Sequence, residues 1–307
     1  MRPGRRGRAA GPDSASATRV VTTARDMRGL AAAARAAGRR IGFVPTMGAL
    51  HDGHLSLIAR ARAECDELVA SIYVNPLQFG PREDFAAYPR DLGRDGALCR
   101  DAGVTILFAP AEGEIHLPDH RTWISVAGLE DVLCGRTRPG HFKGVATVVA
   151  KLFAIVQPHV AFFGEKDAQQ LRIIRRMVRD LHLGVEIVGC PTVRAADGLA
   201  LSSRNAYLSP AERLAAPVLH RALAAAAEAA RAGETDAARL VAGVRAAIEA
   251  EPLVRLDYAE AVDDDTLEPV TAIRGRVLLA VAAYFGRARL IDNVVLEPSG
   301  RRAEPRT

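Results

Sequence analysis

The chain has 307 residues, of which 49% are hydrophobic and 25% are charged, so it is long enough for one large or two smaller domains and too apolar for wholesale disorder. No apolar run approaches the ~18 residues of a membrane span, so we expect no membrane partner. Residues 1–18 and 300–307 carry net charges of +3 and +2, which is the whole formal surplus of +5, and a neutral body argues against a nucleic-acid partner.

The two ends of the chain differ in composition from the rest. Residues 1–18 are rich in Arg but have no apolar stretch of the kind found in secretory signals. We predict that 1–18 is a disordered basic tail and that 300–307 is a second disordered tail. A targeting or binding arm at the first tail is the alternative.

Short apolar runs alternate with amphipathic segments through the first two thirds of the chain. The runs at 41–45, 68–74, 104–110, 160–164 and 185–193 are predicted strands, and the segments at 54–65, 144–156 and 167–181 are predicted helices. This alternation is typical of an α/β fold with a parallel sheet covered by helices. Polar clusters follow several of the runs, and ligands of such sheets bind beyond the carboxyl ends of the strands.

The pattern changes near residue 195. Ser209 before Pro210 predicts the start of an Ala-rich helix that ends near Gly233, and Thr235 is the predicted cap of another helix. Predicted strands follow at 255–263, 276–286 and 288–296. We therefore predict one domain over 19–195 and a smaller α+β domain over 196–299.

The cysteines give no sign of a metal or disulfide framework. They are far apart and form no CxxC pair; they are Cys65, Cys99, Cys134 and Cys190. We interpret them as reduced, mostly buried thiols of a cytoplasmic protein.

The stretch "HDGH" places His51 and His54 three residues apart at a predicted strand-to-helix turn. A zincin has its two histidines four apart on a helix with a Glu, and no third ligand is evident here, so metal binding is disfavoured. A helix N-terminus has unpaired N–H groups and a positive dipole end, which favours a phosphate site. His-x-Gly-His is also the pattern of the nucleotidyltransferase superfamily that includes class I aminoacyl-tRNA synthetases. Two ordinary surface histidines are the alternative.

Two further clusters fit a nucleotide site. Lys166 and Asp167 follow a predicted strand and open a helix, where the Lys can reach phosphate oxygens and the Asp can accept from ribose hydroxyls. Ser202, Ser203 and Arg204 form a loop suited to hold a triphosphate. Each cluster alone could be a solvated polar loop.

Together these stretches resemble one family in order and spacing. "PTMGALHDGHLSLI", "SIYVNPLQFGPREDFAAYPRD", "RPGHFKGVATVVAKLF", "FFGEKDAQQLRIIRRMVRDL" and "VRAADGLALSSRNAYLS" resemble the pantoate–β-alanine ligases (pantothenate synthetases) over roughly residues 19–297. The resemblance implies a Rossmann-like nucleotidyltransferase domain with a small carboxy-terminal lid domain, and a homodimer. It also implies that D-pantoate attacks ATP to give pantoyl adenylate and pyrophosphate, that β-alanine then displaces AMP to form pantothenate, and that Mg2+ accompanies the ATP.

The resemblance also assigns roles to residues of this chain. The catalytic set that it implies is His51, His54, Lys166, Ser202, Ser203 and Arg204. The ATP contacts that it implies are Pro45, Thr46, Met47, His54, Gly164, Lys166, Asp167, Val193, Ser202, Ser203 and Arg204. The pantoate contacts are Met47, Asn75, Gln78 and Gln170, and the residues matched to β-alanine binding or another role are Tyr88, Arg138 and His141.

At three places the chain departs from the family pattern. Asp52 stands where Glu is common between the two histidines, and Leu199 stands where some members have Met. The acidic cluster that helps hold Mg2+ is replaced by "DLGRDGA", in which Asp95 is the best match for a metal ligand and Asp91 the second.

Two other functions stay open at this point. A different adenylyl- or cytidylyltransferase of the superfamily would leave a nucleotidyl group on its product, and an inactive nucleotide-binding regulator would catalyse nothing. Acyl adenylate formation requires in-line positioning and preorganised cations more than a strong base. The polar clusters have the corresponding amides, hydroxyls and cations, with no Ser-His-Asp or Cys-His set. Retention of His51, His54, Lys166 and the Ser-Ser-Arg loop counts against the regulator, and the product of the reaction separates the ligase from the other transferase.

Overall fold

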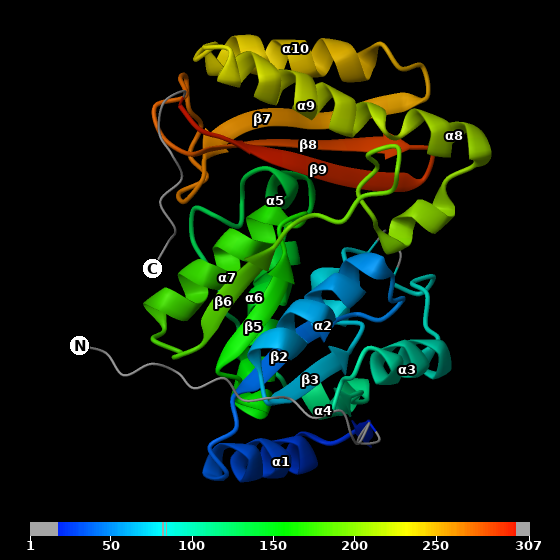
Figure 1. Ribbon diagram of the computed structural model, residues 1–307, viewed down its shortest axis with the longest axis vertical. Helices are drawn as coiled ribbons and strands as arrows, with labels where there is room; N and C mark the ends of the chain where they lie inside the picture. Colours follow the sequence, from blue (N-terminus) through cyan, green and yellow to red (C-terminus); the bar gives the residue numbers. More distant parts are fainter. Residues whose placement is uncertain (1–17, 82, 84, 299–307) are drawn as a thin grey trace.

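The computed structural model of the protein describes residues 18–81, 83 and 85–298, and it contains two sheets (Figure 1). The predicted tails at 1–18 and 300–307 lie outside the described residues apart from Thr18, whose hydroxyl donates to the carbonyl of Val104 over 2.7 Å. None of the helices in the described part of the chain has the length and apolar character needed to cross a bilayer.

The larger sheet has six parallel strands in the order β1-β4-β3-β2-β5-β6. Their bounds are Arg19–Val21 for β1, Ile41–Thr46 for β2, Glu67–Ile72 for β3, Ile106–Phe108 for β4, Val160–Gly164 for β5 and Glu186–Cys190 for β6. The five strands predicted from apolar runs are confirmed. The edge strand β1 was not predicted, because three residues are too few to show a period.

The helices that cover this sheet follow from the alternation of side chains along its strands. In β2, Phe43 belongs to the core beneath α1 (Ala24–Ala36), α6 (His141–Val156) and α7 (Ala168–Asp180). The next residue, Val44, belongs to the core beneath α2 (Asp52–Glu64) and α3 (Leu92–Asp101). Both faces of the sheet are thus buried, and its strands are continuous apolar runs, as parallel sheets require. Three short helices complete this part: η1 at Pro76–Gln78, α4 at Glu112–Ile115 and α5 at Cys134–Thr137.

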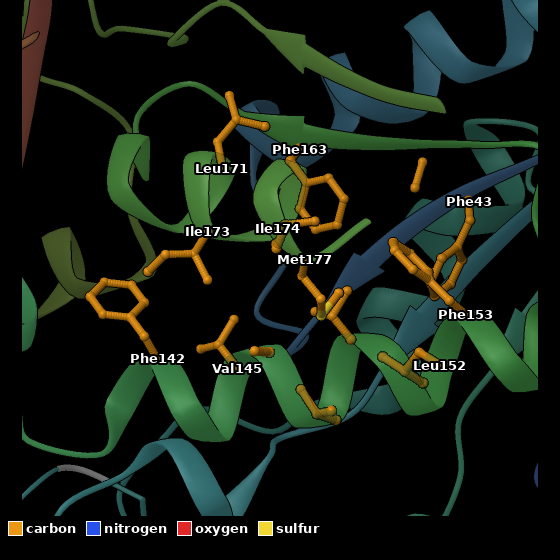
Figure 2. Close-up of a cluster of buried hydrophobic side chains, with 14 of the residues drawn as sticks. Phe43, Phe142, Val145, Leu152, Phe153, Phe163, Leu171, Ile173, Ile174 and Met177 are labelled. Carbon is orange, nitrogen blue, oxygen red and sulfur yellow. The ribbon is translucent and has the colours of Figure 1, made fainter. Parts of the chain in front are cut away.

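Helix α6 is apolar over most of its surface because it lies inside the molecule. Its Phe142, Val145, Leu152 and Phe153 face the side chains of α7, β2 and β5 in Figure 2. The rings of Phe43 and Phe153 meet edge to face with 6.3 Å between centroids. This packing fixes α6 beneath the strands whose carboxyl ends carry the polar clusters.

The strand order reverses between β2 and β5. From β2 the chain moves outward through β3 and β4, and it returns through α6 to add β5 and β6 on the other side of β2. The carboxyl ends of the two strands at this switch point are the expected place for a ligand in an open parallel sheet. "HDGH" follows β2 and Lys166 follows β5, so the topology brings the two clusters to one crevice.

The second sheet is antiparallel, in the order β7-β8-β9, and the α+β prediction for this region is confirmed. Its strands are β7 at Val254–Asp263, β8 at Val277–Phe285 and β9 at Ala288–Leu296, and its helices are η2 at Ser203–Tyr207, α8 at Pro210–Ala215, α9 at Val218–Arg231 and α10 at Ala237–Glu249. Along β8, Leu279 and Val281 face α9 and α10, whereas Leu278 and Ala280 share the core of the parallel sheet. In Figure 1 this sheet lies between the α9–α10 pair and the larger sheet.

Two details of the sequence prediction are wrong here. The single Ala-rich helix is two helices, because Pro217 lacks the N–H needed to continue α8, whereas Ser209 does cap α8 as expected. Helix α10 is capped by Asp236 rather than Thr235: a carboxylate oxygen of Asp236 accepts from the backbone of Ala238 and Arg239 over 2.9 and 3.1 Å. The boundary at 195/196 stays a prediction. All four cysteines are free, as expected.

Candidate functional site

The turn after β2 is held by the buried carboxylate of Asp95 in α3. Its side chain is 1% exposed, and its two oxygens accept from the backbone N–H groups of Ala49 (2.7 Å) and Leu50 (2.9 Å). Gly48 at φ +80° lets the chain pass close to this carboxylate, because a Cβ there would lie 2.9 Å from it. Asp95 therefore positions the segment that leads into "HDGH".

The assignment of Asp95 as a magnesium ligand stays a prediction, and this geometry does not support it, since both of its oxygens accept from the turn and it lines neither cavity described below. Its place in the sequence near the site could not reveal which way the carboxylate points. Asp91, the second choice, caps α3 by accepting from the backbone of Arg94 over 2.9 Å. Within the described ranges no three His, Cys, Asp or Glu side chains come together to hold a metal ion.

The two histidines of "HDGH" form a capping box at the start of α2. Nδ1 of His51 accepts from the backbone N–H of Gly53 over 3.1 Å, and Nδ1 of His54 accepts from the backbone N–H of His51 over 3.4 Å. Their rings lie 4.2 Å apart between centroids. A side chain at Gly53 would collide with His51, with 2.7 Å between the added Cβ and the ring, so the glycine permits this close packing.

This geometry fixes the protonation of both rings. A ring nitrogen that accepts a hydrogen bond carries no proton, so the proton of each neutral imidazole is on Nε2, on the far side of the ring. Burial, then the neighbouring His51 and Lys166, lowers the pKa of His54 to about 3. Burial and Lys166 also lower the pKa of His51. Near neutral pH the pair therefore offers two uncharged Nε2–H donors.

A cavity of about 240 Å³ gathers the predicted site residues. Its lining includes Pro45, Thr46, Met47, His51, His54, Asn75, Gln78, Tyr88, Arg138, His141, Gly164, Lys166, Asp167, Gln170, Val193, Ser202, Ser203 and Arg204. Every site residue predicted from the sequence is in this set except the metal candidates. Residues as far apart in the sequence as Pro45 and Arg204 thus meet at the switch point of the sheet.

A second, larger cavity of about 1100 Å³ adjoins the first and opens between the two sheets. The two cavities share Gln78, Phe79, Arg138, His141, Lys166, Asp167, Gln170, Ser202 and Arg204 in their linings. The far wall of the larger one comes from β8 and β9 and includes Tyr284, Arg289 and Asn293. Because the smaller cavity is below the ~300 Å³ of ordinary ligand pockets, a nucleotide with a second substrate needs both.

Lys166 is positioned from both sheets. It follows β5, its Nζ lies 3.8 Å from a carboxylate oxygen of Asp167, and its side chain is 19% exposed. The side-chain amide of Asn293 in β9 donates to the backbone carbonyls of Glu165 and Lys166, each over 3.0 Å. Sequence reasoning missed Asn293, because nothing local links it to a turn 127 residues away.

The Ser-Ser-Arg loop is also tied to the second sheet. Ser202 caps η2 by accepting from the backbone of Arg204 over 3.3 Å, and the hydroxyls of Tyr88 and Ser203 lie 3.4 Å apart. The hairpin before the loop is held by a bidentate pair between Arg194 and the buried Asp292, at 2.6 and 2.8 Å. Asp292 was missed, although a charge on the buried face of an alternating strand could have revealed it.

The pantoate candidates are joined by a hydrogen-bond network in the wall of the cavity. Asn75 is 1% exposed and its amide donates to the side-chain oxygen of Gln78 over 3.0 Å. A guanidinium only donates, so Arg138 donates to Nε2 of His141 over 2.9 Å, and Nδ1 of His141 donates to the carbonyl of Gln78 over 2.8 Å. Arg138 also pairs with Glu83, from Nε to a carboxylate oxygen over 2.7 Å. Glu83 was not predicted.

Replacing Gly144 by Ala should destabilise the protein by about 1–3 kcal/mol, because the added Cβ overpacks the backbone that carries Gln78. It should also raise the KM for pantoate, the substrate that the family resemblance assigns to Gln78. The Cβ would lie 2.3 Å from the carbonyl oxygen of Leu77 and 2.8 Å from the amide nitrogen of Gln78. Urea unfolding and the KM for pantoate measure the two effects.

The matched control is Gly243→Ala, another glycine inside a helix, whose Cβ would meet nothing within 4 Å. It should leave the KM unchanged and stabilise the protein by about 0.5–1 kcal/mol, since Ala is the better helix former. Equal behaviour of the two variants would contradict the close approach of α6 to η1.

Comparisons with known proteins identify a family. The family profile described as pantoate-beta-alanine ligase matches residues 19–295. The pantothenate synthetase of Heliobacterium modesticaldum is 55% identical over 279 residues, which cover 91% of this chain and 99% of that protein. The pantothenate synthetase of Moorella thermoacetica is 55% identical over 278 residues, covering 91% and 98%.

Two solved structures are similar over nearly their whole length. The crystal structure of pantothenate synthetase from Thermus thermophilus has a TM-score of 0.86 and 51% identity, and the match covers 92% of this chain and 100% of that one. The pantoate-beta-alanine ligase from Francisella tularensis, complexed with beta-gamma ATP and beta-alanine, has a TM-score of 0.75 and 32% identity, covering 91% and 98%. With this identity over this coverage, the chain belongs to the pantoate–β-alanine ligase family.

Proposed function

We propose that the two adjoining cavities condense D-pantoate with β-alanine, at the expense of ATP, to pantothenate. The intermediate is pantoyl adenylate, and the other products are pyrophosphate and AMP. Family membership supports this activity. The single observation that supports it most directly is the capping box of His51 and His54, which holds two Nε2–H donors at a helix start within one cavity with Lys166.

ATP is assigned to the smaller cavity and its rim. Its phosphates lie at the N-terminus of α2, where the helix dipole and the two imidazoles favour negative charge. Lys166 and the loop of Ser202, Ser203 and Arg204 line the same cavity. Gly164, Asp167 and the backbone at Val193 line the part left for ribose and adenine, with Pro45, Thr46 and Met47 beside them.

The first step is attack of the pantoate carboxylate on the α-phosphorus of ATP. A carboxylate is ionised at neutral pH, so no base is needed and the site must orient the two substrates and stabilise charge. Gln78, Gln170, Asn75 and Met47 are assigned to pantoate. As pyrophosphate leaves, negative charge grows on the phosphate oxygens, where the neutral imidazoles donate and Lys166 and Arg204 supply positive charge.

The second step uses the larger cavity. The uncharged amine of β-alanine attacks the acyl carbon of the adenylate, AMP leaves with both electrons of the broken C–O bond, and the nitrogen releases a proton to give the amide. The relative from Francisella tularensis is described with beta-alanine bound, and Arg138, His141 and Tyr88 are the residues of this chain assigned to that substrate or to a neighbouring role. The region of β8 and β9 acts as the lid.

Mg2+ is proposed to enter with ATP rather than to occupy a protein site. The described residues supply no group of three metal ligands, and Mg2+ commonly keeps several waters and binds mainly to substrate phosphates. When bound, it would neutralise part of the triphosphate charge. A homodimer and a cytoplasmic location complete the proposal, the latter supported by four free cysteines, three of them buried.

The purified protein with ATP, Mg2+ and D-pantoate should release pyrophosphate and hold an acyl adenylate, and AMP should appear only after β-alanine is added. Separate assays of AMP, ADP, pyrophosphate and inorganic phosphate measure this. ADP and inorganic phosphate as products would indicate an acyl-phosphate ligase and contradict the proposal. A nucleotidyl group retained on the final product would indicate another nucleotidyltransferase. The absence of any turnover would indicate a binding protein.

A further inference from the structure

A chain of hydrogen bonds runs from Lys151 through His116 and Asn75 to Gln78. Nζ of Lys151 lies 3.1 Å from Nδ1 of His116, and Nε2 of His116 lies 2.9 Å from Oδ1 of Asn75. Nδ2 of Asn75 then donates to Oε1 of Gln78 over 3.0 Å. Lys151 and His116 line neither cavity, and nothing in the sequence pointed to them.

Lys151 sets the direction of the hydrogen bond between His116 and Asn75. An ammonium group can only donate, so Nδ1 of His116 accepts and the ring proton is on Nε2. Lys151 is held in place by a second bond, from Nζ to the carbonyl of Ile115 over 2.8 Å. Burial, then Lys151 and His120, lowers the pKa of His116 to about 4, in agreement with a neutral ring. His116 therefore donates from Nε2 to Asn75.

This donor and two backbone groups together set which way the amide of Asn75 faces. Oδ1 receives Nε2–H of His116 and the backbone N–H of Leu77 (3.3 Å), whereas Nδ2 faces the carbonyl of Gly144 over 3.2 Å. With the amide turned over, Nδ2 would meet two donors and Oδ1 would meet an acceptor at the Gly144 carbonyl. Asn75 is 1% exposed, so no solvent could relieve that mismatch.

The orientation of Asn75 in turn fixes Gln78. Oε1 of Gln78 is taken by Asn75, so Nε2 is left for the cavity, where it donates to Sδ of Met47 over 3.2 Å. A thioether is a weak acceptor. A carboxylate or hydroxyl oxygen of a substrate would replace it and form a stronger bond with the same Nε2–H.

We propose that His116, oriented by Lys151, is a positioning residue that makes Gln78 a hydrogen-bond donor toward an oxygen of the hydroxy-acid substrate. This inference rests on the proposed function, since it assigns the pantoate pocket to Gln78. His116 touches no substrate and acts only through the two amides.

The test is His116→Phe, which keeps an aromatic ring but removes the donor to Asn75. The KM for pantoate should rise about tenfold, the effect of a buried polar group left without its partner, while the KM for ATP changes less than about twofold. His116→Gln should recover most of the loss, since its amide can accept from Lys151 and donate to Asn75. The matched control is His120→Phe. The ring of His120 lies 5.3 Å from that of His116 between centroids but takes no part in the hydrogen bonds from Lys151 to Gln78, so both KM values should stay unchanged.

Several outcomes would overturn the inference. They are an unchanged KM for pantoate in folded His116→Phe, an equal rise in the KM values for both substrates, or no recovery in His116→Gln. If His116→Phe does not fold, Lys151→Met takes its place and should raise the KM for pantoate about threefold with the KM for ATP unchanged. An assay of the unaltered protein distinguishes the two proposals. If it releases no pyrophosphate in the presence of pantoate, the proposed function fails. If it does release pyrophosphate, the variants test only the role of His116.

Discussion

Replacing His54 by Ala should lower the rate of pantoate adenylation by roughly 10²- to 10³-fold, about 2.7–4 kcal/mol, the usual cost of losing one preorganised donor to developing charge. Nδ1 of His54 is occupied by the backbone of His51, so Nε2–H is the group left to act on phosphate. The affinity for pantoate should change much less, because that pocket is assigned to Gln78 and Gln170. Single-turnover release of pyrophosphate and pantoate titration measure the two quantities.

His54 has two tasks, and His54→Asn separates them. The side-chain oxygen of Asn can accept the N–H of His51 and keep the cap, but Asn cannot reach the position of Nε2. It should therefore lose as much rate as His54→Ala while staying more stable. Recovery of the rate by Asn would mean that capping, not donation, is the essential role.

The second half-reaction is an independent control. Attack of β-alanine on supplied pantoyl adenylate transfers no nucleotidyl group, so it should suffer less than adenylation in either variant. Loss of amide formation with adenylation spared would contradict the phosphate role of the histidines. Loss of bound zinc together with activity would contradict it too.

Stability should fall steeply when the pH drops from 6.5 to 5. Burial is the leading cause that lowers the pKa of His54 and His141 to about 3 and of His116 to about 4 in the folded chain. The unfolded chain binds these protons near pH 6.5, so the stability present above 6.5 is lost as the pH falls below it. Each histidine lowers the free energy of unfolding by up to about 1.4 kcal/mol per pH unit below 6.5. Three of them lower it by about 6 kcal/mol at pH 5, which is comparable to the whole stability of many domains.

Urea unfolding at half-unit steps between pH 7 and 5 measures the slope of the free energy of unfolding against pH. This range lies above the pH at which most carboxylates titrate. His54→Asn removes one of the three groups and keeps the cap, so its slope should be smaller by up to about 1.4 kcal/mol per pH unit. A slope equal to that of the unaltered protein would mean that His54 is not held neutral by the fold.

Local sequence patterns determined the elements of the fold. The runs that became β2 to β6 are apolar because a parallel sheet is covered on both faces, and the turn residues Ser209 and Gly233 stand where helices begin and end. Where a local signal was ambiguous, the prediction was wrong. Thr235 and Asp236 are both good caps, and in the structure the cap is Asp236.

The sequence also predicted a set of site residues that the structure brings to one cavity. Several of them are in clusters after strands, and strands of a parallel sheet end at one edge. Others, such as Arg138 and His141, were predicted only from the family resemblance. Sequence alone did not determine how the side chains are directed. Asp95 is close to the site in the chain, yet its carboxylate is turned away to hold the backbone at Ala49 and Leu50.

Only the tertiary structure decided which distant residues hold the site together. Asn293 reaches the backbone at Lys166, Asp292 pairs with Arg194, and His116 supports Gln78 through Asn75. Propensity and periodicity are properties of neighbours in sequence, whereas these bonds form between elements that meet only after both sheets have packed. The direction of a hydrogen bond, and with it the protonation of His54 or His116, depends on such partners and therefore cannot be read from the sequence by itself.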